Sequence, residues 1–265
     1  MKQLLEVAEM ERFSGVILDC RFSLTDSDFG RKSYSEGHIP GAFYLDLERD
    51  MSAPRERHGG RHPLPASTDF AGKLAAMGID RDTTVLLYDD SRFVFAARCW
   101  WMMRALGFRT PLLLNGGYSA WLEAGGVPQL SAPSAVPYAV ADVPAQWPMC
   151  CDRHQLVALQ AEGACLVDAR EAVRYRGEHE PIDPVAGHIP GAQNLPWQGL
   201  SGENGKLLEV SVLQSSWGEL ADARPLIVYC GSGVSACVNI FSLAVIGRED
   251  VWLYGGSWSD WCSHL

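Results

Sequence analysis

The sequence predicts an α/β protein made of two copies of one domain, each a mainly parallel sheet doubly wound with helices on both faces. Three observations support this prediction. The motif "GHIPGA" stands at residues 37–42 and again at 187–192. Short apolar runs typical of buried strands alternate with helical patterns. The repeat is also too long for a solenoid, whose units have roughly 20–50 residues, so it indicates duplicated domains.

The elements of the first copy follow one another in a regular order. "GVILD" (15–19) and "TVLLYD" (84–89) are predicted as buried strands. "DFAGKLAAMG" (69–78) and "FVFAARCWWMMRALG" (93–107) are predicted as helices, the second with Gly107 as its C-cap. The glycine pair of "LLLNGGYSAW" (112–121) closes this copy.

The second copy repeats this order. "CLVDAR" (165–170) corresponds to "VILDCR" (16–21), and "VWLYGGSWSDW" (251–261) corresponds to "LLLNGGYSAW". Between the copies, residues 127–148 hold five prolines and almost no charge, which predicts a semi-rigid linker. We therefore expect an N-terminal domain at 1–126 and a C-terminal catalytic domain at 149–265.

Composition narrows the functional class. The chain has 265 residues, 47% of them hydrophobic, and a formal net charge of −10. This charge disfavours nucleic acid and anionic membranes as partners. Eight cysteines without a C-x-x-C pair, in a chain that shows no export signal, predict reduced thiols and a cytoplasmic location. The pair at 150–151 lacks further ligands at zinc-finger spacing, so we expect no metal site and no cofactor.

The duplication separates structural features from functional ones. His38 and His188 both stand in the repeated motif, so we interpret them as turn histidines. The pairs Asp19–Arg21 and Asp168–Arg170 are also present in both copies, and they are predicted as ion pairs of the scaffold. A reactive group is expected where the two copies differ.

Such a difference follows the central strand of each copy. "VLLYD" ends in Asp89, whereas "LIVYC" ends in Cys230. The loop after Cys230 is "GSGVS", and a helix is predicted to begin near Ser235. Bare amides of such a loop and the positive end of a helix favour an anion. They would lower the pKa of the thiol and make it a nucleophile.

These motifs together resemble those of tandem-domain rhodanese sulfurtransferases, the thiosulfate and 3-mercaptopyruvate sulfurtransferases. The resemblance extends from about residue 10 to 262 and rests on the repeated "GHIPGA", an acid in place of the first cysteine, and "CGSGVSA". It implies two rhodanese-like domains with the site in the second copy, facing the cleft between the domains. It also implies a small anionic sulfur donor, a persulfide on Cys230, and cyanide or a thiol as acceptor, with a thioredoxin-like protein among the candidates.

The resemblance also assigns roles to other residues. Ser232, His62 in "GGRHPLP" and Asp46 match a relay that assists proton transfer. "GGRHPLP" has no counterpart in the second copy, which supports a special role for His62. The remaining loop residues are expected to hold the transferred sulfur: Gly231, Gly233, Val234 and Ser235.

Arginines are expected to bind the anionic end of the donor. Arg174 in "RYRG" matches the family arginine with this role, and the neighbouring Arg176 could share it. The position six residues after the strand aspartate is Thr25 in the first copy, so Arg174 is specific to the second.

One departure bears on the donor. Mercaptopyruvate enzymes carry a second arginine where this chain has Ile182 and Asp183. Arg61 or Arg92 could substitute for it. Thiosulfate enzymes carry basic residues in the loop, whereas the loop after Cys230 has no charge, so the sequence slightly favours 3-mercaptopyruvate.

Two other functions also use a cysteine in such a loop. A persulfide carrier would load the same cysteine but deliver its sulfur to a protein partner. A cysteine-dependent phosphatase is disfavoured, because the loop lacks the arginine that closes a phosphate-binding loop. Cys237 is expected to pack in the core rather than to resolve a disulfide. A chain with two domains and its own cleft can act alone, so we expect a monomer.

Overall fold

The computed structural model describes residues 2–265, and these form two compact units. The first unit comprises the chain up to Ala53, Leu64–Pro148 and Glu203–Leu207. The second comprises Pro54–Pro63, Met149–Gly202 and Leu208–Leu265. Each unit thus includes one short segment from the other half of the sequence. No repeat or periodicity marks these two segments. The predicted domains at 1–126 and 149–265 therefore did not assign either segment to the unit that it joins.

Each unit is built on a five-stranded sheet whose neighbouring strands are all parallel. The strands of the first unit are β1 (Leu4–Leu5), β2 (Val16–Asp19), β3 (Ala42–Tyr44), β4 (Val85–Tyr88) and β5 (Leu112–Leu114). Those of the second are β6 (Cys150–Cys151), β7 (Cys165–Asp168), β8 (Gln193–Asn194), β9 (Leu226–Tyr229) and β10 (Val251–Tyr254). The orders are β1-β5-β4-β2-β3 and β6-β10-β9-β7-β8. This identical order confirms that the fold is duplicated.

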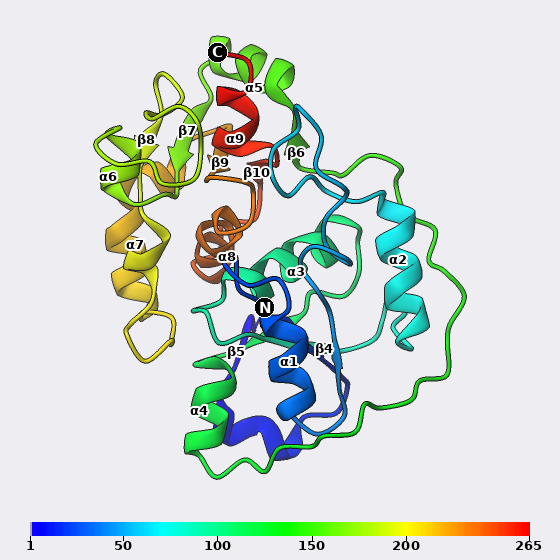
Figure 1. The fold of residues 1–265 in the computed structure, drawn as a ribbon. Coiled ribbons are helices and arrows are strands. Elements are labelled where there is room, and N and C mark those ends of the chain that lie inside the picture. Colours follow the sequence, from blue (N-terminus) through cyan, green and yellow to red (C-terminus); the bar gives the residue numbers. More distant parts are fainter. Residues whose placement is uncertain (1) are drawn as a thin grey trace. The chain divides into compact units, whose positions relative to one another are not determined.

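Helices connect the strands in both units (Figure 1). The first unit has α1 (Phe29–Glu36), α2 (Ser67–Ala76), α3 (Val94–Ala105) and α4 (Gly117–Glu123), with a 3₁₀ helix at Val7–Arg12. The second has α5 (Arg153–Ala161), α6 (Ala172–Tyr175), α7 (Val210–Trp217), α8 (Ala236–Val245) and α9 (Ser257–Cys262), with 3₁₀ helices at Trp197–Leu200 and Gly218–Asp222. The strands and helices predicted for the first copy are confirmed, within a few residues at their ends.

Both faces of the second sheet are covered, because its central strand is buried on both sides. Successive side chains of a strand point to opposite faces. Ile227 and Tyr229 of β9 pack in a cluster with residues of α5 and α9. Val228 points to the other face and is also fully buried, and α8 contacts both β9 and β10. The doubly wound architecture predicted from the alternating pattern is therefore confirmed.

The features present in both copies are structural, as predicted. Arg21 donates to the Asp19 carboxylate over 2.6 Å, and Arg170 donates to that of Asp168 over 2.7 Å. His38 Nδ1 lies 2.8 Å from the Tyr34 carbonyl oxygen, and His188 Nδ1 lies 2.7 Å from that of Tyr175. Arg21 and Arg170 also donate to the carbonyls of Gly37 and Gly187, each over 2.7 Å, so the turns after α1 and α6 are tied to the ends of β2 and β7.

The proline-rich segment 127–148 contains neither helix nor regular strand. It is attached to the first unit by backbone hydrogen bonds: Gln129 exchanges a pair with His38, and the Tyr138 N–H donates to the Ala75 carbonyl. Within residues 2–265, none of the helices has both the length and the apolar character needed to cross a membrane.

Candidate active site

Cys230 directly follows β9, at the carboxyl end of a central strand of the second sheet. Helix α8 begins at Ala236, with Ser235 as its N-cap. Five residues therefore separate the thiol from the first turn of the helix. The Cys230 side chain is buried, with 2% of its surface exposed. In open parallel sheets ligands bind at this edge, so the position is that of a binding site.

Helix α9 fixes the orientation of the loop that follows Cys230. The Trp258 N–H donates to the Cys230 carbonyl, and the Ser259 N–H donates to the Gly231 carbonyl, each over 3.0 Å. The Cys230 N–H in turn donates to Ser257 Oγ over 3.1 Å. These bonds engage the carbonyls of Cys230 and Gly231 with α9, while the amides of Ser232 and Gly233 donate to the sulfur.

Gly233 is required for the shape of this loop. Its φ is +75°, a backbone angle that residues other than glycine rarely adopt. A Cβ at this position would also lie 2.3 Å from the Gly255 carbonyl oxygen. The loop therefore packs directly against the backbone that leads into α9, which leaves no room for a side chain at residue 233.

The loop stabilises the thiolate of Cys230. Burial is the largest influence, and it raises the pKa of the thiol. Hydrogen bonds from the Ser235 hydroxyl and from the amides of Ser232, Ala236 and Gly233 lower this pKa. Together they outweigh burial, so the pKa of Cys230 lies below the ordinary value for a thiol. The same donors would stabilise negative charge on a group attached to the sulfur.

Ser232 contacts His62 within the second unit. His62 Nδ1 lies 2.8 Å from Ser232 Oγ, and both side chains are nearly inaccessible, with 9% and 5% of their surfaces exposed. Ser232 thus combines two contacts, because its amide faces Cys230 and its hydroxyl meets the imidazole. The predicted pairing of Ser232 and His62 is present in the geometry, and their role in proton transfer stays a prediction.

Two guanidinium groups lie at the start of the loop. A Cβ built on Gly231 would be 2.8 Å from Arg61 Nη2 and 3.6 Å from Arg174 Nη2. Arg174 is held by Glu180, to which its Nε and Nη2 donate over 3.1 and 2.7 Å. Two cationic groups thus stand beside the residue that follows Cys230, which suits an anionic ligand.

Acidic side chains already neutralise these two arginines. Asp183 accepts from Arg61, and it also accepts from Arg174 over 3.3 Å. Glu180 is the second acid; burial raises the pKa of its carboxyl, but the Arg174 hydrogen bond and two amides lower it below its usual value. The group formed by Arg61, Arg174, Glu180 and Asp183 therefore has a net charge of zero, because two cations are matched by two anions. An incoming anion has to share the guanidinium groups with Asp183.

Of the remaining predicted site residues, Val234 lies in the loop after Cys230, whereas Arg176 and Asp46 lie outside it. Arg176 is half exposed and donates twice to Glu178, and it is not among the groups nearest Gly231. Val234 is buried within the loop. Asp46 belongs to the first unit, where it accepts from the Tyr44 hydroxyl and from two backbone amides. Its place in a relay with His62 stays a prediction.

In the first unit Asp89 occupies the position that matches Cys230. It follows β4 as Cys230 follows β9, and it is also buried. Its Oδ1 accepts from the amides of Ser91 and Phe93, and its Oδ2 accepts from those of Phe95 and Ala96. The first copy thus keeps an amide cradle for an anion, and its own carboxylate fills it.

Sequence reasoning underestimated two residues of the site. From the sequence, Arg61 was expected only as one of two possible substitutes for the second arginine of mercaptopyruvate enzymes. Asp183 was noted only as one of the two residues that stand at the position of that arginine. The other substitute, Arg92, lies in the first unit in the loop after Asp89. The fragment "GGRHPLP" did carry a signal for Arg61, because the residue directly precedes His62 and occurs in one copy only.

Comparisons with known proteins agree with this geometry. The family model for the rhodanese-like domain matches residues 2–124 and again 152–264. A probable 3-mercaptopyruvate sulfurtransferase of Pseudomonas aeruginosa is 45% identical, over 93% of this chain and 88% of that protein. A putative thiosulfate sulfurtransferase of Mycobacterium tuberculosis is 40% identical, over 93% of this chain and 87% of its own.

The fold gives the same result. The structure of a 3-mercaptopyruvate sulfurtransferase from Leishmania major superposes with a TM-score of 0.87 and 29% identity. The match covers 100% of this chain and 75% of that one. The chain therefore belongs to the rhodanese family, with two rhodanese-like domains in tandem. Its relatives place it among the sulfurtransferases.

Proposed function

We propose that this sulfurtransferase takes the thiol sulfur of 3-mercaptopyruvate onto Cys230, where it becomes the outer sulfur of a persulfide, and passes it from there to cyanide or a thiol. One observation carries the proposal. A buried cysteine with a lowered pKa is surrounded by loop amides, and the serine of that loop contacts a histidine. The loop amides stabilise a thiolate, and the contact between serine and histidine can transfer a proton.

The first step forms an S–S bond and breaks a C–S bond. The Cys230 thiolate attacks the sulfur of 3-mercaptopyruvate, and the electron pair of the C–S bond moves to carbon 3 of the leaving pyruvate. The proton of the donor thiol ends on that carbon. One thiolate and 3-mercaptopyruvate thus give one anionic persulfide and pyruvate, with atoms and charge balanced. The amides of the loop stabilise the persulfide anion.

The Ser232–His62 pair suits the proton transfer in this step. Pyruvate leaves as a carbanion or enolate and needs a proton, whereas sulfite leaves thiosulfate without one. A hydroxyl and an imidazole 2.8 Å apart form a short path for a proton. Such a path would be unnecessary in an enzyme that used thiosulfate alone, so it favours 3-mercaptopyruvate as the donor.

The two arginines beside Gly231 suit the carboxylate of the donor. A monoanion needs less positive charge than the thiosulfate dianion. Arg61 and Arg174 are already paired with Asp183 and Glu180, so they offer directed N–H groups and little net charge. Thiosulfate is the second donor considered, because a relative of similar identity carries its name.

The transferred sulfur can be followed by intact mass. Reduced protein is incubated with 3-mercaptopyruvate or with thiosulfate, and Cys230→Ser is treated in parallel. We expect the wild type to gain one sulfur atom, faster from 3-mercaptopyruvate, and Cys230→Ser to gain none. Equal gain in Cys230→Ser would refute the persulfide site, and faster loading from thiosulfate would reverse the order of donors.

The acceptor is tested by adding cyanide or a small thiol to the loaded protein. Loss of the added sulfur within a catalytic cycle supports the enzyme. Slow loss to small acceptors, together with fast loss to a thioredoxin-like protein, would instead favour a persulfide carrier. We propose the cytoplasm as the compartment, because the chemistry needs a reduced Cys230. A monomer without nucleic-acid or membrane partners stays our expectation from the sequence.

A further inference from the structure

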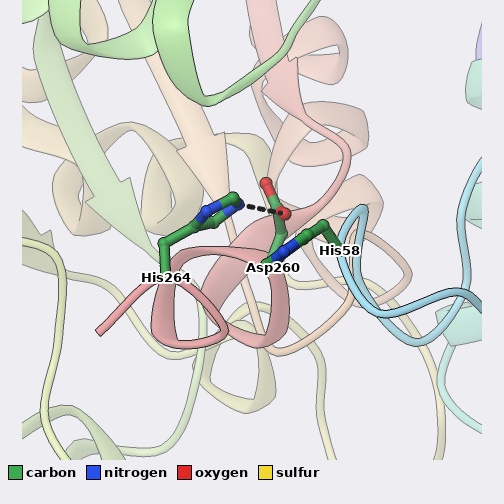
Figure 2. Close-up of side chains that lie close together, drawn as sticks. All are labelled: His58, Asp260 and His264. Atoms are coloured by element: carbon green, nitrogen blue, oxygen red, sulfur yellow. Dashed lines mark ion pairs between the residues drawn. The ribbon is translucent and has the colours of Figure 1, made fainter.

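Three potential metal ligands from two distant parts of the chain meet in the second unit. His58 lies in the segment 54–63, Asp260 in α9, and His264 just after that helix (Figure 2). One ligand atom of each residue lies within 4.8 Å of the others. The two histidines are exposed and Asp260 is buried, so the cluster is open to solvent on one side.

We propose that His58, Asp260 and His264 bind a divalent transition-metal ion, zinc foremost, that fastens the segment 54–63 to α9. Two imidazoles and one carboxylate are a usual ligand set for zinc, with water in the fourth position. His264 Nε2 lies 3.4 Å from Asp260 Oδ1. That is roughly the separation of two ligands on one tetrahedral zinc with bonds of about 2.0–2.1 Å.

The hydrogen bonds around His58 leave one ring nitrogen with a lone pair for a metal. Its ring is stacked on that of His264, with the centroids 4.1 Å apart, so one of the two exposed rings turns when both bind one ion. Ser263 Oγ donates its proton to the Asp260 carbonyl over 2.6 Å. The same oxygen lies 2.8 Å from His58 Nδ1, so it accepts from an Nδ1–H. This tautomer puts the free lone pair of His58 on Nε2. Ligand histidines in metal sites are oriented by the same kind of outer hydrogen bond.

The carboxylate of Asp260 is oriented in a similar way. The Tyr254 hydroxyl donates to Oδ2 over 2.6 Å, and the Gly59 N–H donates to Oδ1 over 2.8 Å. Each oxygen keeps a lone pair besides these bonds, and His264 already faces Oδ1.

A bound ion would act on the segment that carries Arg61 and His62. The Arg61 N–H donates to Ser259 Oγ over 3.1 Å, and Gly60 packs against the Gly256 backbone. The residues that follow His58 are thus already attached to α9 and to its N-cap. An ion joining His58 to Asp260 and His264 would tie the remaining exposed end of the segment to the same helix.

Cobalt(II) is the probe for this site. Cys230→Ser protein is titrated with Co²⁺, because histidine and carboxylate ligands give visible ligand-field bands without the near-ultraviolet band of thiolate ligands. We expect one equivalent to bind, and zinc to displace it. His58→Ala and His264→Ala should each weaken binding more than tenfold, since even outer partners of ligands contribute roughly 10–100-fold. His154→Ala, at an exposed histidine of α5, is the matched control and should bind as well as the parent.

Trypsin gives a second readout that does not depend on the spectrum. Arg55 and Arg57 are exposed sites next to His58. We expect Zn²⁺ to slow cleavage there in the wild type and in His154→Ala, but not in His264→Ala. Equal metal affinity in all variants, or a spectrum with thiolate charge transfer, would overturn the proposal. The outcome is independent of sulfur transfer, because neither readout uses Cys230.

Discussion

His62 Nδ1 lies 2.8 Å from Ser232 Oγ, although 170 residues separate the two in the sequence. The serine also belongs to the loop whose amides face Cys230. A group that can accept or deliver a proton is therefore in contact with the loop that surrounds Cys230. This contact can distinguish the two donors considered, because pyruvate leaving 3-mercaptopyruvate needs a proton, whereas sulfite leaving thiosulfate does not.

Ser232→Ala should slow transfer from 3-mercaptopyruvate far more than transfer from thiosulfate. The change removes the hydroxyl and keeps the amide that faces Cys230. We expect kcat with 3-mercaptopyruvate to fall about 10²–10⁴-fold, the usual contribution of acid–base catalysis, and kcat with thiosulfate to fall much less. Thiocyanate formation measures both rates. Equal losses with both donors would show that the hydroxyl positions the loop and moves no proton.

Ser235→Ala should raise the pKa of Cys230, because its hydroxyl is the strongest of the groups that lower it. A hydrogen bond to a charged group contributes ~1.5–3 kcal/mol, so its loss should raise the pKa of the thiol measurably. In the wild type the thiolate persists above its lowered pKa and is lost as the pH falls through it. In the variant this loss occurs at higher pH.

The rate of alkylation by iodoacetamide as a function of pH measures this shift. Ser215→Ala, on the exposed side of α7, is the control and should leave the midpoint where it is. An unchanged midpoint in Ser235→Ala would assign the low pKa to the amides alone.

Asp183→Asn should improve the use of anionic donors. The acid pairs with both Arg61 and Arg174, so its neutralisation frees positive charge beside Gly231. We expect kcat/KM for thiosulfate to rise about tenfold, which is ~1.4 kcal/mol, mainly through KM. Glu178→Gln removes an acid that pairs only with the exposed Arg176 and serves as the control. A higher KM in Asp183→Asn would mean that the acid is needed to orient the two arginines.

Gly233→Ala should disrupt the loop. The new Cβ would require a left-handed φ and would collide with the Gly255 carbonyl. We expect the free energy of unfolding to fall by about 1–3 kcal/mol, the cost of such strain, and alkylation of Cys230 to lose its low pH midpoint. Gly199→Ala is the matched control, because a Cβ there meets nothing within 4 Å. Thermal unfolding and the alkylation profile of both variants decide the point.

The duplication explains why much of the fold could be predicted, and why Cys230 could be singled out as a candidate nucleophile. Each strand pattern occurs twice in the sequence. The presence of Cys230 where the first copy has Asp89 is therefore visible as a difference between two otherwise matching segments. The pairs Asp19–Arg21 and Asp168–Arg170 lie two residues apart, so the local pattern sufficed to identify them.

The surroundings of Cys230 could not be predicted in the same way. His62 and Arg61 belong to the segment 54–63, which has no periodicity and packs with the second unit. Arg61 and Arg92 looked equivalent in the sequence, and only their places in the fold distinguish them. The meeting of His58 with Asp260 depends equally on contacts across some 200 residues, and no spacing rule describes such contacts.

Asp89 has a consequence for the resting state of the second domain. In the first domain the amide donors are matched by the Asp89 carboxylate, which belongs to the chain itself. In the second they are matched only while the sulfur is ionised. A protonated Cys230 leaves its donors without an anion, and a persulfide supplies one again. If the persulfide forms as proposed, its anion takes the place in the second loop that the Asp89 carboxylate holds in the first.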